Sequence, residues 1–153
     1  MEWNRATVDA AAKIEGGNGY PNLNGIAVFS QTDKGVLVTV RVKNLPKSQI
    51  CNESIYAFHI HNGESCTGNK EDQFSNAKTH YNPYDCPHPY HAGDLPSLIE
   101  NGGFAYMTVL TNRFTVDEII NKVIIIHENK DDFTTQPSGI SGTKIGCGKI
   151  IKV

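Results

Sequence analysis

The sequence predicts an all-β protein built as an antiparallel sandwich or barrel. Two observations favour this fold class. Short runs with strand-like spacing recur along the chain and are separated by turn residues. Two long segments, residues 62–101 and 128–146, lack strand periodicity. Because loops of this length are uncommon in compact domains unless they are functional or held together by a covalent or metal link, we expect both to carry function.

Seven segments have the alternation or the β-branched content of strands. They are residues 6–14, 22–30, 35–42, 54–61, 104–110, 122–127 and 147–153. Asp33-Lys34-Gly35 supplies a turn between the second and third segments, and Asn101-Gly102-Gly103 precedes the fifth. Residues 123–126 are wholly apolar, which indicates a buried strand.

One short helical signal interrupts the strands. Thr115 stands three residues before Glu118, the spacing of a capping box, and an apolar pair follows at Ile119 and Ile120. This pattern predicts one or two helical turns over residues 115–120, serving as a connector without chemistry of its own.

Composition limits the domain count and the partners. The 153 residues are 39% hydrophobic, so residues 1–153 are expected to form a single domain with its own core. The formal net charge of −2 does not point to nucleic acid or to an anionic membrane. No apolar run approaches the length of a membrane span.

The N-terminus and the cysteines bear on the compartment. Residues 1–5 have no apolar signal core, so we expect a cytoplasmic protein if Met1 is the native start and an extracytoplasmic one if a signal peptide was removed. The four cysteines are an even number, compatible with two disulfides in an oxidising compartment or with four reduced thiols.

All six histidines fall into one metal-site pattern. His59 and His61 are two residues apart on a predicted strand, so their imidazoles share its outer face while Phe58 and Ile60 take the other. His127 ends the apolar run and is expected to join them as a ligand. Neutral imidazole is the commonest side-chain ligand for copper and zinc.

The remaining histidines lie in the first long loop. His80, His88 and His91, with Asp94, supply three nitrogens and one oxygen, a closed tetrahedral set that suits zinc. A bound metal would supply ordering energy to a loop that packing alone does not hold. The alternatives are that His88 and His91 lie on the loop surface and that Asp94 caps a turn.

These residues resemble the copper,zinc superoxide dismutase family. The matching motifs are Phe58-His59-Ile60-His61, His80-Tyr81-Asn82-Pro83, His91-Ala92-Gly93-Asp94-Leu95, residues 123–132 around His127, and Gly146-Cys147-Gly148. Residues 94–98 and 132–139, including Gln136-Pro137, are similar to the bacterial branch. The resemblance implies a Greek-key β-barrel or sandwich of about eight antiparallel strands with two long functional loops.

The resemblance also implies a metal site. The copper ligands would be His59, His61, His80 and His127, and the zinc ligands would be His80, His88, His91 and Asp94. His80 would be shared by both metals as a bridging imidazolate. Asp131 would accept hydrogen bonds from His59 and His88 and so connect the two sites; alternatively, it is a solvated loop acid.

The implied activity is superoxide dismutation. One superoxide would reduce the copper and leave as oxygen, and a second would reoxidise it and leave as hydrogen peroxide, with His80 carrying one of the two protons. Zinc, which has no redox chemistry, would hold the loop and set the basicity of the bridge. The alternatives are a non-enzymatic copper or zinc binder of the same fold and a zinc-only structural domain. Family members include dimers and monomers, so a homodimer is one of two alternatives.

One residue departs from the family pattern. Lys144 stands three residues before the last cysteine, where the family usually has arginine at the copper mouth. Lysine keeps the positive charge but loses the planar fork, so Lys144 is expected to guide superoxide less efficiently than arginine; alternatively, it is a surface lysine. Lys70 and Lys78 are weaker candidates for guidance.

The resemblance implies a disulfide between Cys66 and Cys147, joining the first long loop to the last strand. Cys51 and Cys86 are additional to that pattern. These two cysteines would form a second bridge or remain free thiols, and a Cys86 thiolate on zinc is disfavoured because four other ligands already saturate that metal.

Overall fold

The computed structural model describes residues 7–47 and 54–153. Within these ranges the chain forms eight antiparallel strands in one sheet, a nearly closed barrel. The strands are β1 (Ala10–Gly16), β2 (Asn24–Thr32), β3 (Gly35–Lys43), β4 (Ile55–His61), β5 (Asp94–Ile99), β6 (Phe104–Thr111), β7 (Val123–His127) and β8 (Lys144–Lys152). A single-turn α1 (Val116–Ile119) and a 3-10 turn η1 (Ser75–Ala77) are the helical elements of the described residues.

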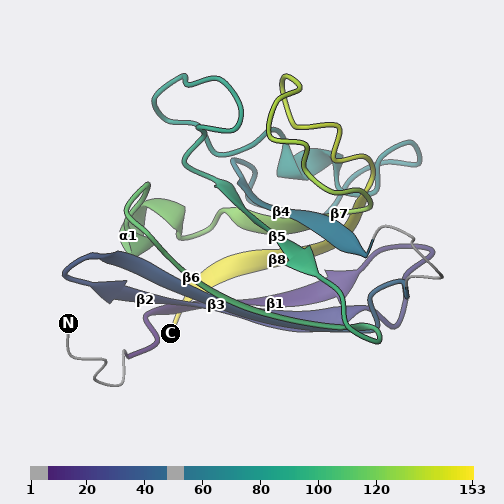
Figure 1. Ribbon diagram of the computed structural model, residues 1–153, viewed down its shortest axis with the longest axis horizontal. Coiled ribbons are helices and arrows are strands. Elements are labelled where there is room, and N and C mark those ends of the chain that lie inside the picture. The colour runs from purple at the N-terminus through teal and green to yellow at the C-terminus, as the bar shows by residue number, and fades with distance from the viewer. Residues whose placement is uncertain (1–6, 48–53) are drawn as a thin grey trace.

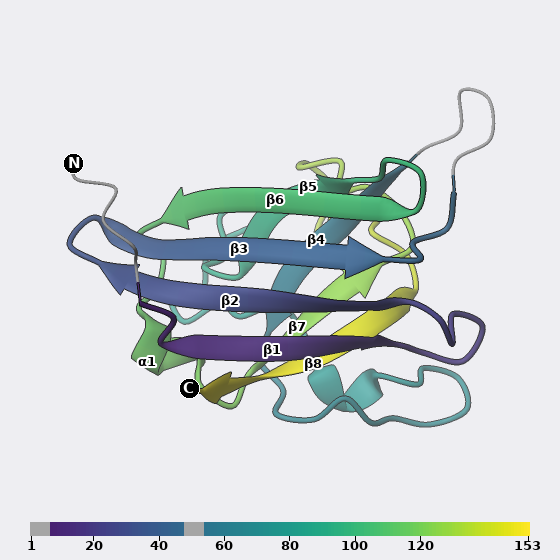
Figure 2. The same ribbon diagram turned by 90° about the horizontal axis from the view of Figure 1, so that it is seen from below.

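The barrel is flattened into two layers (Figure 1). The strand order is β5-β4-β7-β8-β1-β2-β3-β6, so β3 to β4 and β6 to β7 are crossover connections of the Greek-key kind. One layer contains β1, β2, β3 and β6, and the other contains β4, β5, β7 and β8 (Figure 2). Both long loops cover the outer side of the second layer (Figure 1).

Alternation along the strands fills the barrel. On β3, Val36, Val38, Val40 and Val42 have no exposed surface and point into the core, while the intervening residues are half-buried or exposed. This period of two is the pattern expected for a strand with one buried face. It is what made β3 recognisable from the sequence.

Strands β4 and β7 are buried on both faces. Phe58, Ile60 and Ile126 belong to the barrel core. The opposite face of β7 carries Val123 and Ile125, which pack in a second cluster with loop residues. The loops therefore cover a hydrophobic outer surface that the barrel alone would leave exposed.

Most strands lie within two or three residues of their predicted positions, but the predicted loop boundaries were wrong in two places. Strand β5 lies inside the segment predicted as loop, and β8 begins at Lys144 rather than at residue 147. Among the described strands, β5 pairs with β4 alone, and it carries Pro96, a residue that is tolerated at sheet edges and that weakens a strand signal. The predicted first strand begins at Ala10, and residue 6 lies outside the described residues.

The predicted connector helix forms as a single turn. The Thr115 backbone N–H donates to the Glu118 carboxylate at 2.6 Å, which completes the expected capping box. No helix in the described part of the chain is long and apolar enough to cross a membrane.

Candidate metal centre

The structure brings the predicted ligands together in two groups that share one residue. One group is His59, His61, His80 and His127, and the other is His80, His88, His91 and Asp94. Within each group, the candidate ligand atoms all lie within 4.8 Å of one another, and all seven residues are buried. His80 belongs to both groups.

The strands and the first loop position these residues. His59 and His61 lie on β4, His127 ends β7, and Asp94 begins β5 directly opposite His59 in the β4–β5 pairing. His80 pairs with His61 in an isolated β-bridge, which fixes the loop against β4. Strands β4, β5 and β7 thus carry His59, His61, His127 and Asp94, and the first loop supplies the other three residues.

The two histidines of β4 are almost completely buried. His59 is 0% exposed and His61 is 2% exposed, which excludes the alternative of a solvent-facing pair. They do face away from the barrel core, as predicted from their spacing. The loops fold over that face and remove both rings from water.

Hydrogen bonds to backbone carbonyls determine the tautomers of His61 and His127. The Nδ1–H of His61 donates to the Lys78 carbonyl at 2.7 Å, and that of His127 donates to the Gly142 carbonyl at 3.2 Å. In the neutral rings, each Nε2 then carries a lone pair. These two Nε2 atoms lie 3.2 Å apart, so two lone pairs face each other and favour a cation between them.

Asp131 determines the tautomers of His59 and His88. Its two carboxylate oxygens accept from the Nε2–H of His59 and the Nε2–H of His88, each at 2.8 Å. Gly139 packs against this pair with a φ of +70°, and a Cβ there would collide with the carboxylate. Among the described residues, no hydrogen-bond partner reaches either Nδ1, although His88 Nδ1 lies 3.1 Å from an oxygen of Asp94. Two buried lone pairs therefore lack donors.

His80 joins the two groups through opposite edges of its ring. Its Nδ1 lies 2.7 Å from Asp94 Oδ1 and 3.3 Å from His91 Nδ1. The His80 and His59 ring centroids are only 4.1 Å apart. Nε2, on the other edge of the His80 ring, is the nitrogen left for the group that contains His59.

Burial keeps the rings in the form that binds metal. It lowers the pKa of His61 and His59, and it lowers the pKa of His127 to about 3 with a further contribution from neighbouring His59. Burial alone would raise the pKa of Asp131, but hydrogen bonds from His59, the Phe133 amide and His88 outweigh it, and the pKa lies below its ordinary value. At neutral pH His59, His61 and His127 are therefore neutral imidazoles, and Asp131 is ionised.

This donor chemistry fits copper and zinc. Unprotonated ring nitrogens converge in a buried space in which the described side chains offer no proton donor to two of them. A set of four imidazoles suits copper, and a set of three imidazoles with one carboxylate suits structural zinc.

A pocket of about 420 Å³ opens onto the group that contains His61 and His127. Lys144 and Lys78 also line this pocket, whereas Lys70 is not among its lining residues. The family resemblance implied a position for Lys144 at the copper mouth, and the structure places it in the lining of this pocket together with His61 and His127. Its ammonium, however, donates a hydrogen bond to the carboxylate of Asp72, a contact that the sequence did not indicate.

Cys66 and Cys147 form the expected disulfide, with their Cα atoms 5.7 Å apart. Cys86 carries a free thiol, and Cys51 lies outside the described residues. Cys86 thus has no disulfide partner among the described residues, which agrees with the free-thiol alternative for this residue. The Cys86 backbone N–H donates to the Asn82 side chain at 3.0 Å, so a polar turn holds this residue instead.

Several residues that shape the site had no recognisable signal in the sequence. The Arg113 Nη1 lies within 3.3 Å of the carbonyl oxygens of Pro89, His91 and Asp94. The Gln136 side chain makes two hydrogen bonds to the backbone of His88, at 2.7 and 2.9 Å. A lone arginine or glutamine has no local pattern, and only the family resemblance marked Gln136.

Comparisons with known proteins agree with this geometry. Residues 23–150 match the family described as copper/zinc superoxide dismutase. The chain is 33% identical over 150 residues to a copper-zinc superoxide dismutase of Legionella pneumophila, covering 93% of this chain and 86% of that protein. It is 30% identical over 141 residues to one from Aquifex aeolicus, covering 82% and 78%.

A solved structure is also similar. The crystal structure of a superoxide dismutase-like protein from Bacillus subtilis superimposes with a TM-score of 0.74 at 25% identity, covering 91% of this chain and 96% of that one. With the family match spanning most of the sequence, and with both ligand groups assembled, the chain belongs to the copper/zinc superoxide dismutase family.

Proposed function

We propose that this protein dismutates superoxide to oxygen and hydrogen peroxide. In this proposal, His59, His61, His80 and His127 hold copper, and His80, His88, His91 and Asp94 hold zinc. The observation that carries it is the convergence of unprotonated, buried nitrogens on two adjacent points, with His80 common to both. The family match supports the same activity.

Copper bound there would supply a one-electron couple that takes an electron from one superoxide and gives it to another. Two superoxide anions and two protons thus yield one oxygen and one hydrogen peroxide. The protein residues have the tasks of binding the anion, orienting the ligands and delivering protons.

His80 is the residue that would deliver one of these protons. It lines the pocket, and its Nε2 is the ring nitrogen not engaged with Asp94. Its Nδ1 edge is occupied by the zinc ligands, so the ring keeps its orientation while Nε2 gains or loses a proton. Asp131 accepts hydrogen bonds from His59 and His88 and so keeps these two rings oriented beside His80.

Lys144 would attract the anion. It lines the same pocket as His61 and His127, and an ammonium in a narrow mouth raises the local concentration of a small anion. The net charge of −2 is spread over the whole chain and does not cancel a local positive field.

A second candidate function is metal binding without dismutation. The specific observation in its favour is the ion pair between Lys144 and Asp72, because the ammonium at the mouth then already has a carboxylate partner. The experiment that separates the two functions is elemental analysis of the purified protein together with a superoxide assay after loading with copper and zinc. Dismutation proportional to copper content supports the enzyme. Full occupancy of both metals without activity supports the binder, and zinc alone supports a structural domain.

A further inference from the structure

The positive charge at the mouth of the pocket is already paired. Lys144 donates to Asp72 Oδ2, and its side chain is 16% exposed against 37% for that of Asp72. Lys144 begins β8, whereas Asp72 lies in the loop before η1, so 72 residues separate the partners. The hydrogen bonds from Lys144 and from the Phe74 amide hold the pKa of Asp72 below its usual value, although partial burial opposes them. The partner of Lys144 is thus a carboxylate anion at neutral pH.

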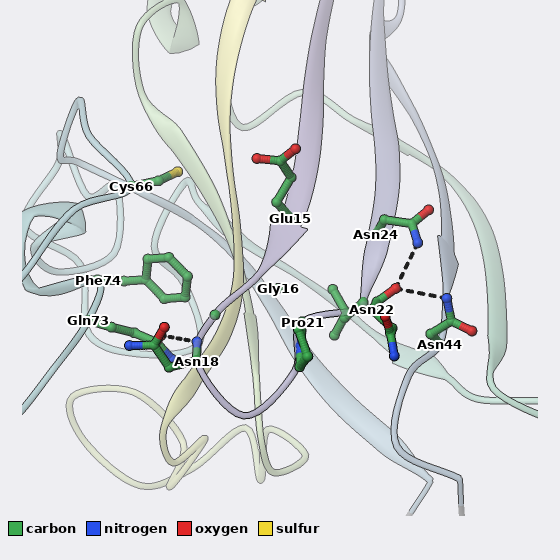
Figure 3. A pocket seen from close by; sticks show the side chains of 12 residues that line it. Glu15, Gly16, Asn18, Pro21, Asn22, Asn24, Asn44, Cys66, Gln73 and Phe74 are labelled. Carbon is green, nitrogen blue, oxygen red and sulfur yellow. Dashed lines mark hydrogen bonds between the residues drawn. The ribbon is translucent and has the colours of Figure 1, made fainter.

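Hydrogen bonds and hydrophobic packing hold the segment that carries Asp72 in place. Asp72 Oδ1 accepts from the Phe74 backbone N–H at 3.0 Å, and the Asp72 carbonyl accepts from Asn69 and Ser75. Gln73 accepts a hydrogen bond from the Asn18 backbone in the turn after β1 (Figure 3). Phe74 is buried against the outer face of β7. The backbone that carries Asp72 is therefore held in place near Lys144.

The disulfide adds a covalent constraint. Cys66 lies in the same loop as Asp72, and Cys147 lies on the same strand as Lys144. The bond therefore keeps the loop beside the strand at the position where the carboxylate meets the ammonium. Cys66, Gln73 and Phe74 line the hollow next to the β1–β2 turn (Figure 3).

We propose that Asp72 is an internal competitor of the anionic substrate for Lys144 and so limits how fast superoxide is captured. This inference rests on the proposed function. A carboxylate in contact with an ammonium cancels most of its field beyond a few ångströms. Superoxide approaching the pocket then experiences the weaker field of a dipole rather than that of a cation. To contact the Lys144 ammonium it must displace the Asp72 carboxylate or share the ammonium with it. Asp72 is a positioning residue in this scheme because it acts through Lys144.

The decisive variant is Asp72→Asn. Asparagine keeps an oxygen that can accept from the Phe74 N–H, so the turn is retained, and it removes the anion from Lys144. The matched control is Glu71→Gln, which removes one negative charge from the adjacent position. Glu71 is exposed, and its backbone N–H donates to the Asn69 side chain at 3.0 Å. Both variants carry the same net charge.

The first measurement is the second-order rate constant for superoxide with the copper- and zinc-loaded protein, taken as a function of ionic strength. Asp72→Asn should raise it by about 3- to 10-fold at low salt, within the range by which local fields change association rates. The gain should shrink as salt is added, because screening reduces interactions beyond a Debye length of about 10 Å at 0.1 M. Glu71→Gln should change the rate by less than about 1.5-fold at the same salt, because its exposed carboxylate is solvated and Asp72, not Glu71, is the ion-pair partner of Lys144.

The second measurement needs no metal and no activity. It is the rate at which an amine-acylating reagent modifies Lys144 in the metal-free protein, read by mass spectrometry with the other lysines as internal references. In the wild type the Asp72 carboxylate occupies the side of the Lys144 amine that a reagent must approach, so Asp72→Asn should speed modification of Lys144 by about 3-fold or more. Glu71→Gln should leave it unchanged.

Two outcomes would overturn the competition, and a third would overturn the proposed function. Equal rate gains in both variants would assign the effect to net charge and overturn the competition. A rate constant for Asp72→Asn at or below wild type, with Lys144 more reactive, would show that the pair exists but does not limit capture, which also overturns it. Wild-type protein without dismutase activity when fully loaded would overturn the proposed function, and the acylation rates would still report whether Asp72 holds Lys144.

Discussion

Cys66 and Cys147 join the first long loop to the last strand across a sequence separation of 81 residues. Cys147 faces the outer cluster with Val123 and Ile125 rather than the barrel core, and Cys66 packs against that cluster. The bond thus covers the same sheet face that carries the metal ligands. It couples the stability of the loop to that of the barrel.

Removing this disulfide should cost much of the folding stability. In the chain-entropy model, closing a loop of this length stabilises the folded state by about 4 kcal/mol. We expect the Cys66→Ala, Cys147→Ala double variant to lose about that much free energy of unfolding, measured by urea denaturation of the metal-free protein. Cys86→Ala is the control because its thiol is free. A loss in the double variant no larger than in the control would contradict a stabilising role.

His80 should affect both metals and His91 only one. His80→Ala removes a nitrogen from each ligand group, whereas His91→Ala removes one from the second group alone. We expect His80→Ala to lower the content of copper and zinc together, and His91→Ala to lower chiefly zinc, both measured by elemental analysis after dialysis. Retention of both metals at wild-type stoichiometry in His80→Ala would exclude the shared ring.

Asp131 should control metal affinity without being a ligand. Asparagine at this position offers one acceptor oxygen in place of two, so it cannot accept from both His59 and His88. Loss of such a supporting hydrogen bond weakens metal binding by about 10- to 100-fold. Competition with a chelator measures this for Asp131→Asn, with exposed Asp33→Asn as the control. Unchanged affinity for both metals would mean that Asp131 orients neither ring.

Arg113 should matter for zinc and not for copper. Its guanidinium joins the carbonyl oxygens of Pro89, His91 and Asp94, two of which belong to residues in the zinc group. A hydrogen bond from a charged donor is worth about 1.5–3 kcal/mol, so Arg113→Gln should weaken zinc binding by about 10-fold or more. Arg41→Gln, an exposed arginine on β3, is the control. An equal loss of copper affinity would point to general loosening of the loop instead.

Acid should destabilise the metal-free protein well above the range in which carboxylates titrate. Burial lowers the folded-state pKa of His61, His59 and His127, that of His127 to about 3, while the unfolded chain has values near the ordinary 6.5. Between these limits the unfolded state binds more protons, so stability rises with pH and is lost as pH falls below about 6.5. Urea unfolding midpoints at pH 7.5, 6 and 5 measure this, and equal midpoints would contradict it.

The sequence alone predicted most strands and the side chains that the structure brings together in two groups. His59 and His61 are informative because a strand places residues i and i+2 on one face, and this rule is local. The strand formed by residues 35–43 was recognisable for the same reason, since its alternating valines repeat with period two. The spacing of His80, His88, His91 and Asp94 within one loop likewise required no knowledge of distant contacts.

Strand β5 and the start of β8 could not be placed in this way. Strand β5 is a sheet edge with a proline, and its extended form depends on pairing with β4 rather than on its own alternation. Likewise, Lys144 is in a strand because it pairs with His127 across β7 and β8, at a point where the register shifts. The positions of both elements depend on pairing with strands that are distant in sequence.

The surroundings of the ligands were decided only by tertiary structure. The sequence could name His61 and Lys144 but not the Lys78 carbonyl that determines the tautomer of the first, nor the Asp72 carboxylate that pairs with the second. These partners come from loops without any periodic signal, and their positions follow from the path that the disulfide, η1 and the β1–β2 turn impose. Local spacing thus determined which atoms could bind a metal, whereas the folded path of the loops determined their protonation, their burial and the charge at the entrance, because those properties depend on contacts between residues distant in sequence.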